Sequence, residues 1–283
     1  MRIVAFERDG STRIGVKKGS NVVDLSLAAP SLPKTLRGLL TSNSLDAAKK
    51  VAETANHKSH LVLSELMLLP PIPDPHKILC IGRNYAEHAK EGGAEVPEYP
   101  DVFMRSRLSI TGSGTPIVCP AISQNLDFEG ELIVVIGKTI YQVSEDQALD
   151  GVAGYSIFND VTLRDYQRRT SQWTIGKNFD GTGAFGPEFV SADELPAGCA
   201  GLQLQTRLNG VLMQNANTND MVFPVATAIS YLSQVMTLEP GDLLATGTPS
   251  GVGYARNPPV WMKPGDLVEV NIESIGNLSN PIV

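Results

Sequence analysis

The segment Asp127-Phe128-Glu129-Gly130-Glu131 carries the residue types best suited to chemistry. Successive side chains of a strand point to opposite faces, so we expect Glu129 and Glu131 on the same side. Two carboxylates that close repel each other, and one loses its charge unless a cation lies between them. The apolar run Leu132–Ile136 follows directly, which places the pair at the edge of a core. A hard-cation site and a solvated acidic strand face both fit this pattern.

A third carboxylate, Asp160, follows the strand-like segment Gly151–Phe158 and precedes the helix-like segment Leu163–Arg169. Taken alone, Asp160 is more typical of a helix N-cap than of a ligand. Arg164 and Gln167 lie three residues apart and therefore share one helical face. A carboxylate beside a guanidinium and an amide suits a site for an anionic, oxygen-rich ligand. Three carboxylates without His or Cys partners favour Mg²⁺ or Mn²⁺, with Ca²⁺ also compatible.

A second cluster lies in the segment from Arg83 to Glu91. On a helix His88 and Glu91 are neighbours, so the carboxylate can orient the imidazole and stabilise its charge. A general base that takes a proton from water needs this arrangement. The alternative is a surface helix of mixed charge. The other three histidines have no comparable neighbours.

Two glycine-containing segments are further candidates for anion binding. Lys177 follows Gly176 among apolar residues, where it fits an anion-binding residue and a turn lysine equally well. The hydroxyl- and glycine-rich loop Thr246–Gly251 follows the strand-like Leu243–Ala245, and its amides could hold a carboxylate. It lacks the lysine and the helix spacing of a phosphate-binding P-loop.

The elements that must position these residues fall into two predicted domains. Residues 1–72 predict a small N-terminal domain with strands over Arg2–Phe6 and Arg13–Val16 and a helix over Ala47–Thr54. The segment Pro70–Pro75 contains four prolines, which fix φ and lack the N–H donor, so it is interpreted as a linker. Residues 73–283 then form the larger domain.

The larger domain is predicted to contain many short strands and few, short helices. The 26 glycines and 19 prolines of the chain favour frequent turns. This pattern indicates a β-dominated α+β domain and not a βαβ array. The expected elements are strands over Lys77–Ile81, Leu126–Ile136, Gly151–Phe158 and Leu202–Leu208, a hairpin turn at Asn209-Gly210, and helices over Asn84–Glu91, Leu163–Arg169 and Pro224–Met236.

Composition excludes several classes of protein. With 283 residues, 42% hydrophobic and 19% charged, the chain has enough apolar material for a large core. A net charge of −7 without a Lys/Arg-rich run argues against nucleic-acid binding. No apolar stretch approaches the ~20 residues of a membrane-spanning helix, and no signal peptide is expected. The three separated cysteines are typical of reduced thiols in a cytoplasmic protein.

Taken together, these motifs resemble the fumarylacetoacetate hydrolase family over roughly residues 75–283. The resemblance depends on their order along the chain: Gly82-Arg83-Asn84-Tyr85 with His88, Asp127–Leu132, Asn159-Asp160 with Arg164-Asp165 and Gln167, Gly176-Lys177, and Thr246–Gly251. The N-terminal unit is similar to the appended domain of longer bacterial members. One departure is Arg105-Ser106-Arg107, which follows the strand Val102–Met104 where many relatives have a lysine in a Lys-Pro-Ser-like stretch. The resemblance therefore does not extend to a substrate-carboxylate contact at this place.

The resemblance implies a fold, a set of roles and an assembly. It implies a mixed-β roll with flanking helices, and usually a homodimer. By resemblance Glu129, Glu131 and Asp160 hold the divalent metal, His88 with Glu91 activates water, and Lys177 steadies developing oxyanion charge. The substrate contacts that it implies are Arg83, Tyr85, Arg164, Gln167 and Thr248.

The reaction that follows is hydrolytic C–C cleavage of a 3-acylpyruvate or related 1,3-dicarbonyl acid through a metal-stabilised pyruvate enolate. Oxaloacetate decarboxylation forms the same enolate without water. Isomerisation, ketonisation or hydration of related 2-oxo acids also fits this site. A metal-holding binding protein without turnover is the alternative from another class.

Overall fold

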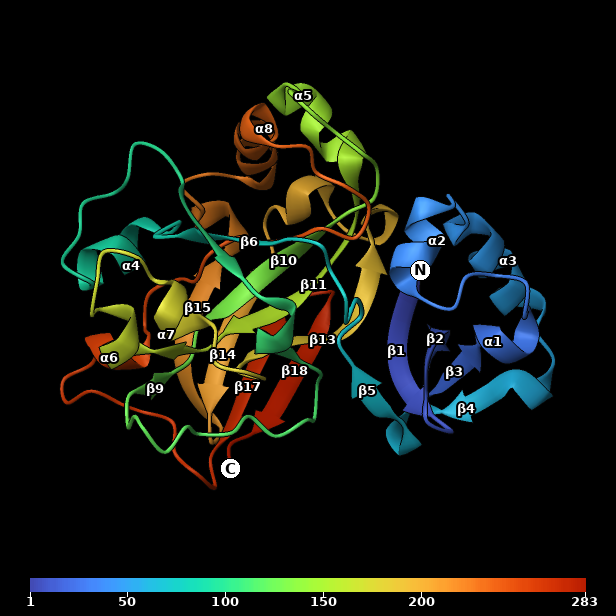
Figure 1. Ribbon diagram of the computed structural model, residues 1–283, viewed down its shortest axis with the longest axis horizontal. Helices are drawn as coiled ribbons and strands as arrows, with labels where there is room; N and C mark the ends of the chain where they lie inside the picture. The colour runs from blue at the N-terminus through green and yellow to red at the C-terminus, as the bar shows by residue number, and fades with distance from the viewer.

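A mixed sheet of twelve strands is the main element of the computed structural model, which describes all residues 1–283 (Figure 1). In spatial order its strands are β4 (His60–Val62), β3 (Asn21–Asp24), β2 (Ser11–Lys18), β1 (Arg2–Arg8), β13 (Gly183–Ser191), β11 (Val152–Asp160), β10 (Gly130–Ile136), β16 (Leu243–Ala245), β6 (Ile78–Gly82) and β7 (Asp101–Arg105), with β5 (Met67–Leu69) on β1 and β8 (Ile110–Thr111) on β13. Two of the pairs, β16 with β6 and β13 with β8, are parallel, and the others are antiparallel.

Two smaller sheets complete the strand structure. The first contains β15 (Val211–Asn217), β14 (Gln203–Leu208), β17 (Leu267–Ile272) and β18 (Gly276–Pro281), and the second pairs β9 (Leu126–Asp127) with β12 (Thr162–Leu163). The hairpin predicted between β14 and β15 is confirmed. Asn209 and Gly210 have φ values of 51° and 79°, as a type I′ turn requires.

The helices are short and flank the sheets. They are α1 (Leu25–Ala28), α2 (Leu36–Thr41), α3 (Leu45–Thr54), α4 (Ala86–Glu91), α5 (Glu145–Ala148), α6 (Arg164–Gln167), α7 (Thr174–Lys177) and α8 (Val225–Val235). The helix expected over Leu163–Arg169 is therefore a single turn. Figure 1 shows α4, α6 and α7 together at one end of the large sheet, with α5 beside α8 at its top. None of the helices combines the length and the hydropathy that crossing a bilayer requires.

Strand β10 is buried over its whole length and separates two apolar cores. Leu132, Val134 and Ile136 point into a core that includes residues of the four-stranded sheet, such as Val270. The alternating residues Ile133 and Val135 point into a second core. A strand buried on both faces has no polar positions, which explains the uninterrupted apolar run in the sequence.

The strand predicted over Leu126–Ile136 is wrong in one respect, because it is divided at Phe128 and Glu129 into β9 and β10. Polar side chains take the place of ladder partners at the break. The backbone N–H of Phe128 donates to Asp127 Oδ1 at 2.9 Å, and that of Glu129 donates to Asn159 Oδ1 at 2.9 Å. Period-2 patterning cannot reveal such a break, since it depends on long-range partners.

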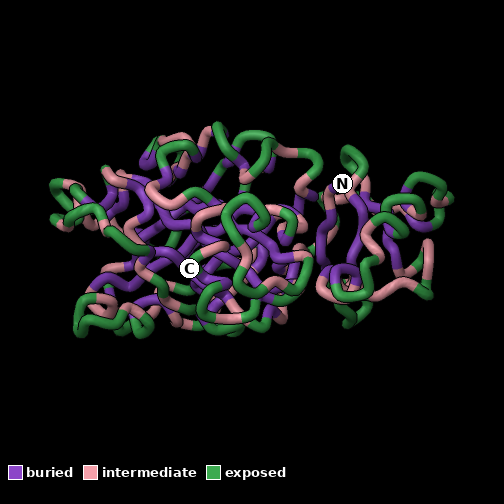
Figure 2. The backbone as a smooth tube through the Cα atoms, turned by 90° about the horizontal axis from the view of Figure 1, so that it is seen from above, coloured by how far each residue is buried: buried purple, intermediate pink, exposed green.

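The N-terminal 72 residues contain β1 to β5 and α1 to α3 and lie to one side of the remainder (Figure 1). They are not separated from it by a gap in the sheet, because Arg2 and Ile3 of β1 pair with Val190 and Phe189 of β13. Ile3 also belongs to the same apolar core as Ile133. Figure 2 shows buried backbone running through both parts. The strand-dominated α+β fold class is confirmed, and the division at residue 72 stays a prediction.

Candidate functional site

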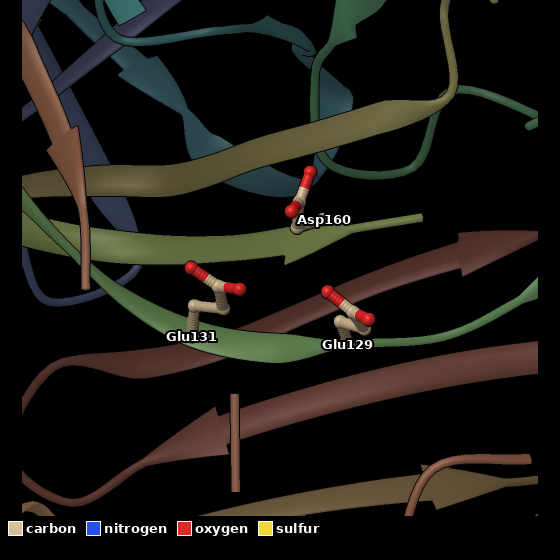
Figure 3. Close-up of side chains that lie close together, drawn as sticks. All are labelled: Glu129, Glu131 and Asp160. Atoms are coloured by element: carbon tan, nitrogen blue, oxygen red, sulfur yellow. The ribbon is translucent and has the colours of Figure 1, made fainter. Parts of the chain in front are cut away.

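The three predicted carboxylates meet in the folded chain. One oxygen each from Glu129, Glu131 and Asp160 lies within 4.8 Å of the others, and all three residues are buried. Figure 3 shows the three side chains facing one space between neighbouring strands. Concentrating buried negative charge in this way is costly unless cations neutralise it. The cluster is therefore a buried candidate cation site and not a solvated acidic face.

Strand register brings the acids together. Glu131 belongs to β10, Glu129 directly precedes it, and Asp160 is the last residue of the adjacent β11. Gly130 lies opposite Asn159 in the ladder, and the backbone N–H of Asp160 donates to Glu129 O at 2.8 Å. Asp160 therefore is not a helix N-cap. Its position at the end of β11 directs its carboxylate toward the two glutamates.

Two cationic side chains neutralise part of this charge. The Nζ of Lys177 donates to Glu129 Oε2 and to Asp160 Oδ2, each at 2.6 Å. The Nη2 of Arg164 lies 2.6 Å from Glu129 Oε1. Burial opposes ionisation of Glu129, but Lys177 and Arg164 outweigh it and lower its pKa to about 2. Lys177 is itself buried, and its acidic neighbours raise its pKa against the effect of burial.

Glu131 differs from the other two acids because it forms no ion pair. Its Oε2 accepts a hydrogen bond from the N–H of Gly247 at 2.9 Å. Burial, followed by repulsion from Asp160 and Glu129, raises its pKa well above the usual carboxyl value. An all-oxygen set with one uncompensated acid matches the ligand preference of a hard divalent cation such as Mg²⁺ or Mn²⁺. The residues present therefore fit a metal ion.

Asp127 is a buried residue of the site to which the sequence assigned no role. It accepts hydrogen bonds from Arg164 Nε at 2.7 Å and from the N–H groups of Gly253 at 2.7 Å and Tyr254 at 3.1 Å. Burial raises its pKa, and Arg164 opposes that rise. Asp127 thereby fixes both the guanidinium of Arg164 and the backbone that carries Tyr254. Its place beside the Glu-x-Glu pair was the only sequence signal.

Arg105, where the chain departs from the family pattern, is also part of this network. Its guanidinium is fully buried and donates to Asp160 Oδ1, to the backbone oxygen of Val161 at 3.1 Å and to Thr182 Oγ1 at 2.9 Å. Its charge compensates Asp160, although Arg105 does not line the cavity itself. Arg105 therefore holds one carboxylate of the triad in place.

The His88–Glu91 pair forms on α4 as predicted. The Nδ1 of His88 lies 2.8 Å from Glu91 Oε1, and Glu91 Oε2 accepts from the N–H of Gly251 at 2.9 Å. The bond to Glu91 occupies Nδ1 and leaves Nε2 as the free nitrogen of a ring that lines the same cavity as the acids. A histidine held in this way is oriented for proton transfer.

The loop Thr246–Gly251 holds carboxylates, but they belong to the protein. The N–H of Gly247 binds Glu131, and the N–H of Gly251 binds Glu91. Both glycines have positive φ, 94° and 101°, and a Cβ at Gly251 would lie 2.2 Å from Met213 O. Only glycine fits these positions. One loop therefore aligns a carboxylate of the triad and the carboxylate partner of the histidine.

The acids and the histidine line one cavity of about 180 Å³, which suits a small metabolite. Among the predicted substrate contacts, Arg83, Arg164, Gln167 and Thr248 line it. Tyr85 does not line it; its side chain is buried, and its backbone forms a β-bridge with Met221. Phe103, Arg168 and Tyr254 also line the cavity, although no sequence pattern assigned them a role. Phe103 and Tyr254 are aromatic, and a single sequence does not distinguish them from core residues.

The fold is strand-dominated, and its paired strands bring a buried carboxylate triad and a histidine to one cavity. This arrangement fits a divalent metal ion beside a proton-transfer group. Residues 77–283 match the family described as fumarylacetoacetate (FAA) hydrolase C-terminal. The chain belongs to the fumarylacetoacetate hydrolase family, as its motifs indicated, and thus to a family of enzymes.

Similar proteins cover both parts of the chain. The mitochondrial oxaloacetate tautomerase fahd2 of Xenopus laevis is 41% identical over 100% of this chain and 90% of its own. The oxaloacetate tautomerase YisK of Bacillus subtilis is 46% identical over 78% of this chain and 74% of its own. The solved structure of a fumarylacetoacetate hydrolase from Exiguobacterium antarcticum is 36% identical, with a TM-score of 0.87 over 100% of this chain and 99% of that one.

Proposed function

We propose that this protein is a Mg²⁺- or Mn²⁺-dependent tautomerase that interconverts the enol and keto forms of oxaloacetate. The observation that carries the proposal is the placement of His88 and the three acids on one small cavity. This arrangement pairs a proton-transfer group with a site for the charge that enolisation creates. The proposal is also supported by the names of the two similar proteins, both oxaloacetate tautomerases.

The proton transfer that we assign to His88 is balanced without any further reactant. A divalent cation held by Glu129, Glu131 and Asp160 would supply positive charge that acidifies the C3–H bond of a 2-oxo acid. His88 Nε2 takes the C3 proton, and the C–H electron pair becomes the C2=C3 double bond. The C2 carbonyl oxygen gains the negative charge, and the proton held by His88 then passes to that oxygen, which gives the enol and returns His88 to its neutral form. The reverse sequence returns the proton to C3.

Lys177 and Glu91 assist at either end of this transfer. The ammonium of Lys177, buried beside Glu129 and Asp160, stabilises negative charge that develops on the substrate oxygen. Glu91 stabilises the imidazolium that forms when His88 accepts the proton. Both effects are strong because the groups lie in a largely buried site of low effective dielectric.

A second candidate, C–C hydrolysis of a 3-acylpyruvate, is favoured by the hydrogen bond between His88 and Glu91. The same pair can take a proton from water, whose hydroxide adds to the carbonyl remote from the carboxylate. Cleavage of the C–C bond then gives a carboxylic acid and the enolate of pyruvate, which takes up one proton. Decarboxylation of oxaloacetate shares this enolate and releases carbon dioxide without water.

Parallel assays separate these reactions. The enol of oxaloacetate absorbs in the ultraviolet, so its ketonisation is followed directly, while acetylpyruvate and fumarylpyruvate report cleavage and pyruvate release reports decarboxylation. We expect metal-dependent ketonisation well above the solvent rate, lost with a chelator and strongly reduced in His88→Asn. Ketonisation that is unaffected by both changes, or cleavage that is faster than ketonisation, would reject the tautomerase proposal.

We also propose that the protein forms a homodimer. Strand β7 is an edge of the large sheet, and its side chains Val102 and Met104 are 40% and 46% exposed. Helix α7 contacts β7 and adds Ile175, which is 60% exposed. An unpaired edge with apolar side chains is typical of a surface that a partner covers. Light scattering of the purified protein tests this, and a monomer mass at micromolar concentration would exclude it.

A further inference from the structure

Most cationic side chains on the cavity are already paired with acids of the protein. Arg83 Nε donates to Asp101 Oδ2 at 2.7 Å. The guanidinium of Arg164 donates to Asp127 and to the side chain of Gln167, its Nη2 lies beside Glu129 without a hydrogen bond of good geometry, and Lys177 bridges two of the acids. Groups held in this way are fixed beside acids of the protein, so none of them offers an uncompensated charge to a second, distal carboxylate of a substrate.

Arg168 is different, because it lines the cavity without forming an ion pair or a side-chain hydrogen bond. It caps α6 directly after Gln167 and is exposed to solvent. Its guanidinium lies 4.2 Å from the centroid of the Tyr254 ring. Stacking on an aromatic ring orients a guanidinium and leaves its N–H edges free for a carboxylate.

The ring of Tyr254 also places this free cation relative to the metal site. The guanidinium of Arg164, which contacts Glu129, lies 4.4 Å from the same ring centroid. Arg168 and Arg164 therefore contact the same Tyr254 ring, and Arg164 in turn contacts the acid triad. Tyr254 is in turn held by the bond from its N–H to Asp127. The cavity therefore has a metal-binding end and a cationic end, with a fixed aromatic wall next to both.

We propose that Arg168 is the specificity-determining residue that binds the distal carboxylate of a 2-oxo diacid. The inference rests on the proposed function, in which the oxo acid end of the substrate lies at the carboxylate triad. A bidentate contact from Arg168 then selects a dianionic substrate over a 2-oxo acid with a neutral tail. Arg168 is partly solvated, so we expect its contact to be stronger than an exposed ion pair and weaker than a buried charged hydrogen bond. Such a contact changes the affinity for the ligand about tenfold.

The test compares malate with lactate, a stable pair that differs in the distal carboxylate. Each is titrated calorimetrically into the full-length protein with saturating Mg²⁺, and the ratio of the two affinities is measured. Arg168→Gln should lower the malate affinity about tenfold and leave lactate unchanged. The matched control is Arg169→Gln, the same charge change at the next residue, whose guanidinium stacks on Tyr166 at 3.4 Å and does not line the cavity.

Steady-state kinetics add a second readout. In Arg168→Gln the KM for oxaloacetate should rise about tenfold while kcat changes little, and Arg168→Lys should recover part of the loss. An unchanged malate-to-lactate ratio in Arg168→Gln, or a wild-type protein that does not prefer malate, would overturn the assignment. The two proposals can also fail separately. If the malate-to-lactate ratio depends on Arg168 but the protein does not tautomerise oxaloacetate, the proposed reaction is overturned and Arg168 remains the carboxylate site.

Discussion

Replacing Glu131 by glutamine separates the metal site from the rest of the fold. Glu131 forms no ion pair, and burial and two neighbouring acids raise its pKa. Its pKa in the folded protein therefore lies above its unfolded value. The folded protein binds more protons than the unfolded chain between those two values, so stability falls as pH rises through that window. Glutamine does not titrate, so Glu131→Gln removes this fall in stability with rising pH. The metal-free variant should therefore be more stable than the metal-free wild type at neutral pH.

The same substitution should abolish stabilisation by metal. A ligand present at 100 times its Kd stabilises a folded protein by about 2.7 kcal/mol. For a chain of 283 residues that corresponds to a rise in Tm of roughly 4–5 °C. If loss of the Glu131 carboxylate weakens binding about 100-fold, the same metal concentration equals the new Kd and stabilises by only about 0.4 kcal/mol. The variant should then shift by about 1 °C.

Thermal unfolding with and without MgCl₂ or MnCl₂, repeated from pH 5 to pH 8, measures both effects. Glu188→Gln is the matched control, because Glu188 is equally buried but pairs with Arg2 and Lys17 outside the triad. This control should have a lower Tm yet keep the full metal-induced shift. A Glu131→Gln protein with the wild-type shift would refute the placement of the metal. Because protons and metal compete for Glu131, the wild-type shift should also grow as pH rises.

Three further substitutions test the remaining parts of the site. His88→Asn should reduce turnover about 10²–10⁴-fold while the metal-induced shift in Tm remains, and a loss of that shift would contradict a role in proton transfer alone. Lys177→Met removes one of the two cationic partners of both Glu129 and Asp160, which keep Arg164 and Arg105, so denaturant unfolding should show a metal-free protein destabilised by about 3 kcal/mol, partly restored by metal; unchanged stability would contradict the ion pairs. Asp127→Asn weakens the anchor of Arg164 and should cost about 1.5–3 kcal/mol while raising the KM for oxaloacetate, whereas an unaltered KM would limit Asp127 to a structural role.

The predicted secondary structure succeeded where the signal was local. The Asn209-Gly210 hairpin formed because its two residues tolerate positive φ, a property of the residues themselves. The apolar run Leu132–Ile136 became a strand buried on both faces, as its composition indicated. The break before it at Glu129 depends on the side chain of Asn159, thirty residues away. No periodicity within the segment carries that information.

The candidate site likewise combines residues that the sequence indicated with contacts that only the fold established. Residue type and spacing made the Glu-x-Glu pair a candidate metal site, while Asp160 and the pair His88–Glu91 were assigned roles only by the family resemblance. The sequence left open whether Lys177 is an anion binder or a turn lysine, and the fold placed its Nζ between two buried carboxylates. Tyr85, which the family motif assigned to the substrate, lies outside the cavity.

The sequence by itself determined which groups have the chemistry: oxygen ligands for a hard cation, a histidine with its carboxylate, and strands to carry them. Only the tertiary structure decided how their charges are balanced. Arg105 neutralises Asp160, Asp127 holds Arg164, and Arg168 is the cavity arginine that forms no ion pair. The physical reason is that a charge is compensated by whatever lies within a few ångströms of it, and those neighbours come from strands and loops far apart in the chain.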